Sequence, residues 1–287
     1  MELSFIKWVQ SFHTEFLDQI FILITMLGEE YFYILVLGYM YWCSNKEITR
    51  YLVLSLTFSS VLNGAMKEIV NSQRPYLVAD IRALRVETAL GTSFPSGHTQ
   101  TVVSFYFALA MRVKKAWAWI LGSTLVVLVG LSRIYLGVHW PRDVVGAIIL
   151  GVLSVLMMMF LYRKEREKGI LWPYYLLIMG IVFSFFFLQS ETYVKGCAAF
   201  MGFMLGTMIE MKYIRFKTQN RALLQLLKFV SGMGLTLIVF LGLKVVLPDT
   251  TPFIGFRYFF TVFSVAAIIP WFFVKIGFSQ TDKAIER

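Results

Sequence analysis

Two histidines and one aspartate are the residues of this sequence best suited to chemistry. His139 and Asp143 lie four residues apart, so on one helical turn they share a face. A carboxylate bonded to one ring nitrogen would fix the imidazole tautomer and leave the other nitrogen free to attack an electrophile. His98 has no such partner nearby in the sequence and is suited to protonate a leaving oxygen.

Three cations accompany these groups, namely Lys67, Arg74 and Arg133. Their mutual repulsion makes convergence unfavourable unless an anion sits among them, and guanidinium forks match phosphate oxygens. Ser96 and Gly97 precede His98 at the start of an apolar run, where a helix N-terminus would offer backbone N–H groups to the same anion. The set predicts a phosphoryl-transfer site that needs no metal.

Each of these features has an ordinary structural interpretation as well. A lone histidine at a membrane interface is usually structural, and Lys or Arg near helix ends usually extends towards the headgroups. Pro-Ser-Gly before a helix is often only a cap. His139 and Asp143 could be metal ligands, but no third ligand with suitable spacing stands nearby. The combination, in this order along the chain, makes chance a poor explanation.

The composition is that of a membrane protein. Of 287 residues, 58% are hydrophobic and only 15% are charged, against about a quarter charged in a typical soluble domain. The net charge of +10 is explained by Lys and Arg that gather in cytoplasmic loops, so we expect no nucleic-acid partner. Cys43 and Cys197 lie in apolar surroundings and are expected to be small core residues.

Apolar runs long enough to cross a bilayer recur along the whole chain. The predicted fold is all-α, a polytopic membrane helical bundle of about nine transmembrane helices. Eight spans are expected near 51–71, 97–112, 117–136, 143–162, 170–189, 195–211, 222–246 and 256–277. One more span precedes these eight. It is either one long tilted helix over 16–43 or, as we favour, a shallow helix to Leu27 followed by a short span from Glu29. A break at Gly28 would spare Glu29 and Glu30 burial in mid-bilayer.

Loop charges predict the orientation. Lys and Arg gather at 44–50, 112–115, 163–168, 212–221 and in the tail 275–287, which places these segments in the cytoplasm. With nine spans the N-terminus lies outside and the C-terminus inside. The candidate site residues then all emerge on the outer face.

These residues resemble the type 2 phosphatidic acid phosphatase superfamily, which includes glucose-6-phosphatase and the vanadium haloperoxidases. Its signature K-x6-RP, PSGH and SR-x5-H-x3-D is matched by Lys67/Arg74/Pro75, by Pro95–His98, and by Ser132-Arg133/His139/Asp143. The resemblance covers roughly 15–160 of the chain. It implies that His139 is a nucleophile oriented by Asp143 and that His98 is the general acid. The phosphate ligands implied are Lys67, Arg74 and Arg133, with Ser96 and Gly97 donating to phosphate oxygens.

The predicted organisation is a catalytic transmembrane core over 1–168 and a further four-helix region with a cytoplasmic tail over 169–287. The extra spans could shape a lateral lipid entrance, form a homodimer face or bind a partner. Small bacterial members of the family stop near 163–168, so the second half carries no catalytic signature.

We expect hydrolysis of a lipid phosphate or pyrophosphate at the outer face of a bacterial plasma membrane, without a cofactor. Candidate substrates are phosphatidic acid, phosphatidylglycerol phosphate and undecaprenyl pyrophosphate. One alternative is hydrolysis of a soluble sugar phosphate or phosphoryl transfer to another acceptor, in which Glu29 and Glu30 could contact headgroup hydroxyls rather than serve as ordinary boundary carboxylates. A third reading is a lipid transporter without turnover.

Overall fold

The computed structural model describes residues 1–89 and 91–282, and within these ranges the chain forms helices with a single isolated β-bridge between Phe216 and Thr281. The last residues of the predicted cytoplasmic tail, 283–287, lie outside the described part. The first half contains α1 (Glu2–Gln10), α2 (Glu15–Met26), α3 (Glu30–Tyr39), α4 (Lys46–Val70), α5 (Pro75–Val78), α6 (Gly97–Val113), α7 (Ala116–Tyr135) and α8 (Pro141–Lys168). The second half contains α9 (Trp172–Ser184), α10 (Glu191–Ile209), α11 (Ala222–Val246), α12 (Thr251–Phe263) and α13 (Ile269–Lys275). Short 3₁₀ or π turns are η1 (Met40–Ser44), η2 (Val86–Thr88), η3 (Glu210–Ile214) and η4 (Ser264–Ile268).

The helices begin where local chemistry favours a start. The Thr14 hydroxyl accepts from the Leu17 amide at 3.1 Å ahead of α2, and the Asn45 side chain accepts from the Ile48 amide at 3.0 Å ahead of α4. Pro141 opens α8, where its missing N–H would have had no partner anyway. These caps satisfy amides that a helix itself leaves unpaired.

Five helices of the described chain are long and apolar enough to cross a membrane, or six if a bent pair counts as one span. The predicted nine spans are therefore not confirmed. The remaining expected spans coincide with α4, α6 and α9. Helices α6 and α9 have only 17 and 13 residues, and α4 has 25 residues but buries polar side chains along its length.

The predicted break at Gly28 is confirmed. Helix α2 ends at Met26, α3 begins at Glu30, and the two helices are bent by 44°. At the break Gly28 lies close to α6, since a Cβ on Gly28 would be 2.8 Å from the Cβ of His98. The structure therefore contains no continuous helix over 16–43, and the break packs directly against a predicted site residue.

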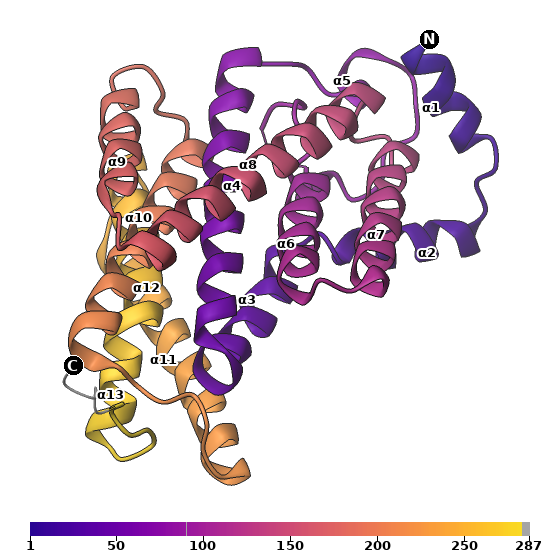
Figure 1. Ribbon diagram of the computed structural model, residues 1–287. Helices are drawn as coiled ribbons and strands as arrows, with labels where there is room; N and C mark the ends of the chain where they lie inside the picture. The colour runs from indigo at the N-terminus through magenta and orange to yellow at the C-terminus, as the bar shows by residue number, and fades with distance from the viewer. Residues whose placement is uncertain (90, 283–287) are drawn as a thin grey trace.

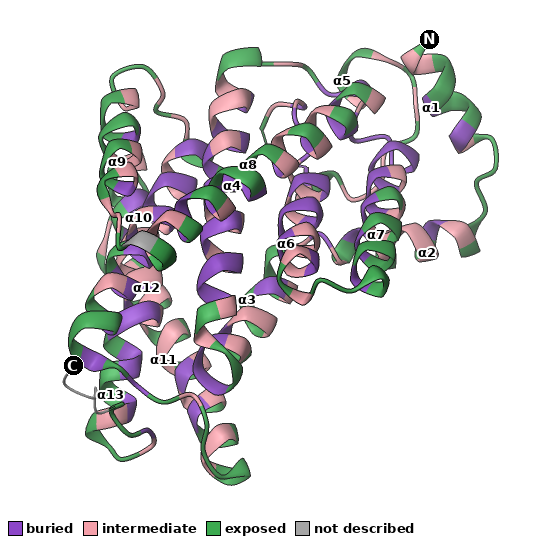
Figure 2. Cartoon of the chain, viewed as in Figure 1, coloured by how far each residue is buried: buried purple, intermediate pink, exposed green. Residues whose placement is uncertain are grey.

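Helix α4 forms the centre of the bundle. Figure 1 shows it between α6 and α7 on one side and α9, α10 and α12 on the other, and Figure 2 shows its buried residues along its length. Glycines permit the closest crossing, since a Cβ on Gly64 would lie 2.5 Å from the Cα of Tyr193 on α10. The second half is therefore packed tightly against the helix that carries Lys67.

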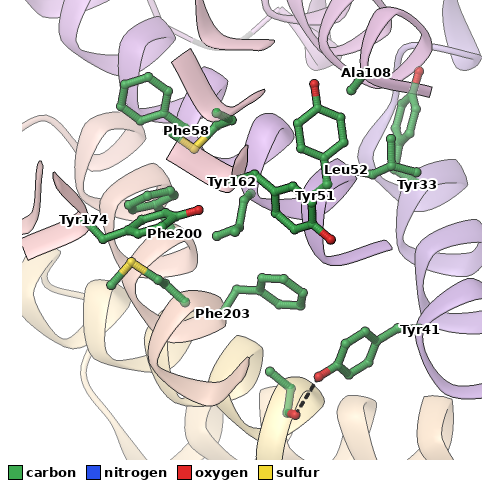
Figure 3. Close-up of a cluster of buried hydrophobic side chains, with 14 of the residues drawn as sticks. Tyr33, Tyr41, Tyr51, Leu52, Phe58, Ala108, Tyr162, Tyr174, Phe200 and Phe203 are labelled. Atoms are coloured by element: carbon green, nitrogen blue, oxygen red, sulfur yellow. Dashed lines mark hydrogen bonds between the residues drawn. The ribbon is translucent and has the colours of Figure 1, made fainter. Parts of the chain in front are cut away.

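The largest hydrophobic cluster lies at this junction of the two halves. Figure 3 shows its aromatic side chains, including Tyr51, Phe58 and Phe200, which come from α4 and α10. The Tyr41 hydroxyl donates to the Ala266 carbonyl at 2.9 Å, so even this polar atom is satisfied inside the cluster. Cys43 and Cys197 are free and buried in the same cluster, as their apolar surroundings predict.

Candidate active site

The predicted catalytic and phosphate-binding residues come from five separate segments that meet at one end of the first-half helices. Lys67 is in the last turn of α4, Arg74 precedes α5, His98 is in the first turn of α6, and Arg133 is in the last turn of α7. Asp143 is in the first turn of α8, and His139 lies just before that helix. Backbone bonds hold the segments together: the Ser96 amide donates to the Asp143 carbonyl at 3.1 Å. The start of α6 is thus tied to the start of α8.

His139 is held by partners at both ring nitrogens. Its Nδ1 lies 3.3 Å from Oδ2 of Asp143, and its Nε2 lies 3.2 Å from Nη1 of Arg74. A guanidinium can only donate, so Nε2 is the acceptor and Nδ1 carries the proton towards the carboxylate. The two partners therefore select the tautomer with the proton on Nδ1 and the lone pair on Nε2.

The environment of His139 also keeps the ring neutral. The side chain is 2% exposed, and this burial lowers the pKa of His139 well below its ordinary range, with Arg133 and Arg74 adding to the effect. Burial disfavours the charged imidazolium, and nearby cations disfavour it further. A neutral imidazole is the form that can act as a nucleophile.

Asp143 accepts more hydrogen bonds than the one that its spacing from His139 predicts. Its Oδ2 accepts from the Ser93 hydroxyl and from the Trp140 amide at 2.8 Å, in addition to the contact with His139. Three donors on one oxygen fix the carboxylate in place. Ser93 is a contribution that the spacing of His139 and Asp143 could not reveal, because it lies 50 residues away.

Arg133 is a buried cation with two open donors. Its side chain is fully buried, and Nη1 donates to the Thr25 hydroxyl at 2.8 Å. Within the described chain Nε and Nη2 have no hydrogen-bond partner. These two atoms lie on one edge of the planar guanidinium, which is the fork that binds two oxygens of a phosphate.

Lys67 and Arg74 are instead occupied by loop carbonyls. The Lys67 ammonium donates to the Thr92 carbonyl, and Arg74 donates through Nε to Gly91 O at 2.9 Å and through Nη1 to Val138 O at 2.9 Å. Both side chains are nearly inaccessible, at 8% and 2% exposure. Loop carbonyls therefore fix the positions of both cations.

His98 faces the break between α2 and α3, and its Nε2 is buried with no partner among the described residues. Ser96 is the N-cap of α6, but its hydroxyl pairs with that of Thr99 at 3.0 Å, and its amide is bonded to Asp143. The helix start therefore has one amide already used. Gly97 is the first residue of α6, half-buried beside Asn63.

The two acidic residues at the break have different surroundings. Glu29 accepts from Arg85 Nη2 at 2.6 Å. Thr88, three residues after Arg85, lies 3.5 Å from Nη1 of Arg133. Glu30 is exposed at the start of α3. Glu29 is thus brought to the edge of the site through Arg85, whereas Glu30 is not.

No group of three or more His, Cys, Asp or Glu side chains in the described ranges could hold a metal ion. The positive charges near His139 are those of Lys67, Arg74 and Arg133, and Asp143 supplies a carboxylate.

Comparison with known proteins agrees with this geometry. The profile of the PAP2 superfamily matches residues 48–167, which include every signature residue, and that of the PAP2 superfamily phosphatase, transmembrane extension, matches residues 194–281. The bacitracin transport permease protein BcrC of Bacillus licheniformis is 31% identical over 161 residues, which are 50% of this chain and 78% of that protein. The chain belongs to the PAP2 superfamily.

Other PAP2 proteins give the same picture. An undecaprenyl-diphosphatase of Sulfolobus acidocaldarius is 32% identical over 47% of this chain and 66% of its own length. The crystal structure of a transmembrane PAP2-type phosphatidylglycerolphosphate phosphatase from Bacillus subtilis superposes with a TM-score of 0.50 at 25% identity, over 58% of this chain and 87% of that one. With its apolar helices and transmembrane extension, this PAP2 chain is an integral membrane protein.

Proposed function

We propose that this PAP2 protein hydrolyses a lipid phosphate or diphosphate through a phosphohistidine formed on His139. The observation that carries the proposal is the open fork of Arg133 beside a neutral, tautomer-fixed His139. A buried cation with two unused donors is unfavourable unless an anion completes it. The names of its relatives, an undecaprenyl-diphosphatase and a phosphatidylglycerolphosphate phosphatase, support a lipid substrate.

The residues divide the reaction between them. The Nε2 lone pair of His139 forms a bond to phosphorus while the bond from phosphorus to the leaving oxygen breaks, and that oxygen takes a proton from His98. Arg133, Arg74 and Lys67 balance the charge on the phosphoryl oxygens. His98 then accepts a proton from the water that attacks the phosphohistidine, and free His139 is regenerated. Asp143 stabilises the positive charge that develops on the imidazole.

We further propose the predicted placement in the membrane: nine spans, an outer site, an N-terminus outside and a C-terminus in the cytoplasm of a bacterial cell. Residues 1–168 then act as the catalytic core and 169–287 as an additional membrane region, which could also serve as a dimer face. A site at the level of the membrane surface would accept a lipid headgroup without extraction of its tails.

The test is phosphate release by the purified protein in detergent. The panel contains phosphatidic acid, phosphatidylglycerol phosphate, undecaprenyl diphosphate and glucose 6-phosphate. We expect the lipids to be preferred, vanadate to inhibit and EDTA to have no effect. His139→Ala should abolish release and the trapping of labelled phosphate on the protein.

The matched control is His13→Ala, which changes the one exposed histidine outside the site. This variant should keep the activity of the parent protein. Full activity of His139→Ala, or complete dependence on a divalent metal, would contradict the mechanism. Preference for glucose 6-phosphate, or transfer of phosphate to an added lipid acceptor, would favour the alternative reaction.

A further inference from the structure

Arg85 is a cation at the site that belongs to none of the signature motifs. Its Nη2 donates to Glu29 at 2.6 Å, and its Nε lies 3.1 Å from an oxygen of Glu87. Its φ of 57° is in the left-handed region, which residues with a side chain seldom adopt. Two carboxylates and an unusual backbone conformation thus hold this guanidinium in one place.

Two chains of contacts connect Arg85 with the surroundings of Arg133 and His98. The Thr88 hydroxyl donates to the Arg85 carbonyl at 2.9 Å and lies 3.5 Å from Nη1 of Arg133. Glu29, which holds the guanidinium, directly follows Gly28, the residue packed on His98. The charge of Arg85 accordingly acts on both Arg133 and His98.

This position matters because His98 meets the leaving group in the proposed reaction. A single phosphoryl group is already served by Lys67, Arg74 and Arg133. A fourth cation beside the proton donor fits negative charge on the atoms next to the leaving oxygen. In a lipid diphosphate, the atom bonded to that oxygen is the phosphorus of a second phosphoryl group.

We propose that Arg85 binds the second phosphoryl group of a lipid diphosphate and so determines preference for diphosphate over monophosphate lipids. This inference rests on the proposed function. The terminal phosphorus bonds to His139 as the bridging P–O bond breaks. His98 protonates the bridging oxygen, and the lipid monophosphate leaves while Arg85 compensates its charge. Glu29 and Glu87 hold the guanidinium in place until the substrate arrives.

The experiment compares farnesyl diphosphate with farnesyl phosphate, which share a tail and differ by one phosphoryl group. Arg85→Gln should lower the ratio of kcat/KM for diphosphate to monophosphate about 10- to 100-fold, as expected for loss of a charge-assisted hydrogen bond. Arg85→Lys keeps the charge and should restore much of the ratio. A merely structural role would change both substrates alike and would not be rescued in this way.

Arg82→Gln is the matched control, because Arg82 lies in the same loop but pairs with Asp18 rather than with Glu29. Its ratio should equal that of the parent protein. An equal loss on both substrates in Arg85→Gln, or no loss on either, would overturn the assignment. The assignment would also be overturned if Arg85→Gln changed only the preference for phosphatidylglycerol phosphate over phosphatidic acid. The two phosphates of phosphatidylglycerol phosphate are not bonded to each other, so this lipid has no second phosphoryl group next to the leaving oxygen. If the parent protein releases phosphate from none of these lipids, the proposed function itself fails.

Discussion

Arg133 in the first half and Lys228 in the second are both buried cations with 0% exposure, yet their surroundings differ. Lys228 on α11 donates to three carbonyls, those of Trp42 at 3.1 Å, Lys217 at 3.4 Å and Thr218 at 2.7 Å. Arg133 leaves Nε and Nη2 without a partner in the described chain. The ammonium of Lys228 is complete as it stands, whereas the guanidinium of Arg133 is completed only by a further acceptor.

The difference teaches how to separate a structural from a functional buried charge. Removing a cation from water is strongly unfavourable, and hydrogen bonds to carbonyls offset part of that penalty. Lys228 uses them to join α11, η1 and the segment 217–218. Arg133 carries the penalty with two donors unused, and the proposed anion would offset it. The two residues should therefore respond in opposite ways to substitution.

The largest expected effect is on activity. Arg133→Met should lower kcat/KM for phosphate release by about 10²- to 10³-fold, the loss typical when one preorganised donor to a reacting oxyanion is removed. Lys228→Met should stay within a few-fold of the parent protein when rates are normalised to folded protein. Similar losses in the two variants would remove the basis of the comparison.

Ligand binding should distinguish the two residues next. At 100 times its Kd, vanadate should stabilise the parent protein by about 2.7 kcal/mol, measured as a rise in Tm in detergent. Lys228→Met should keep this rise, and Arg133→Met should lose most of it. A full vanadate response in Arg133→Met would mean that its open fork is not the anion site.

Stability without ligand should show the reverse order. Lys228→Met leaves three carbonyls without their donor and should destabilise the protein by roughly 1–3 kcal/mol. Arg133→Met removes an incompletely paired buried charge and should be neutral or stabilising. Thermal unfolding of both variants in the same detergent measures the difference, and a more damaging Arg133→Met would contradict it.

The smallest effect concerns the contact between the two halves. Glu68, next to Lys67 on α4, accepts from the Gln189 and Ser190 amides at 2.9 Å each, ahead of α10. Glu68→Gln should lower the free energy of unfolding by about 0.5–2 kcal/mol, as for loss of a helix cap. Phosphate release should change little. A large loss of activity would instead show that this contact positions Lys67.

Much of the fold can be predicted from apolar runs and turn residues, because whether a segment forms a helix depends largely on its own composition. The break at Gly28 follows from the same reasoning, since two adjacent carboxylates disfavour mid-bilayer burial. The number of membrane spans is harder to predict from the sequence. Helix α4 buries polar residues against other helices of the bundle. Its low hydropathy therefore does not show that it is surrounded by protein on most sides.

The sequence alone determined the helical class and the signature residues, and the four-residue spacing predicted the contact between His139 and Asp143. The contact forms, although His139 lies just before α8 and does not share a helical turn with Asp143. Only the tertiary structure decided which nitrogen of His139 accepts from Arg74, which donors of Arg133 stay open, and that Glu29 pairs with Arg85. The contacts of Arg133 with Thr25 and of Arg85 with Glu29 join residues 108 and 56 positions apart. Such contacts depend on how helices pack and bend against one another, and no local spacing encodes that.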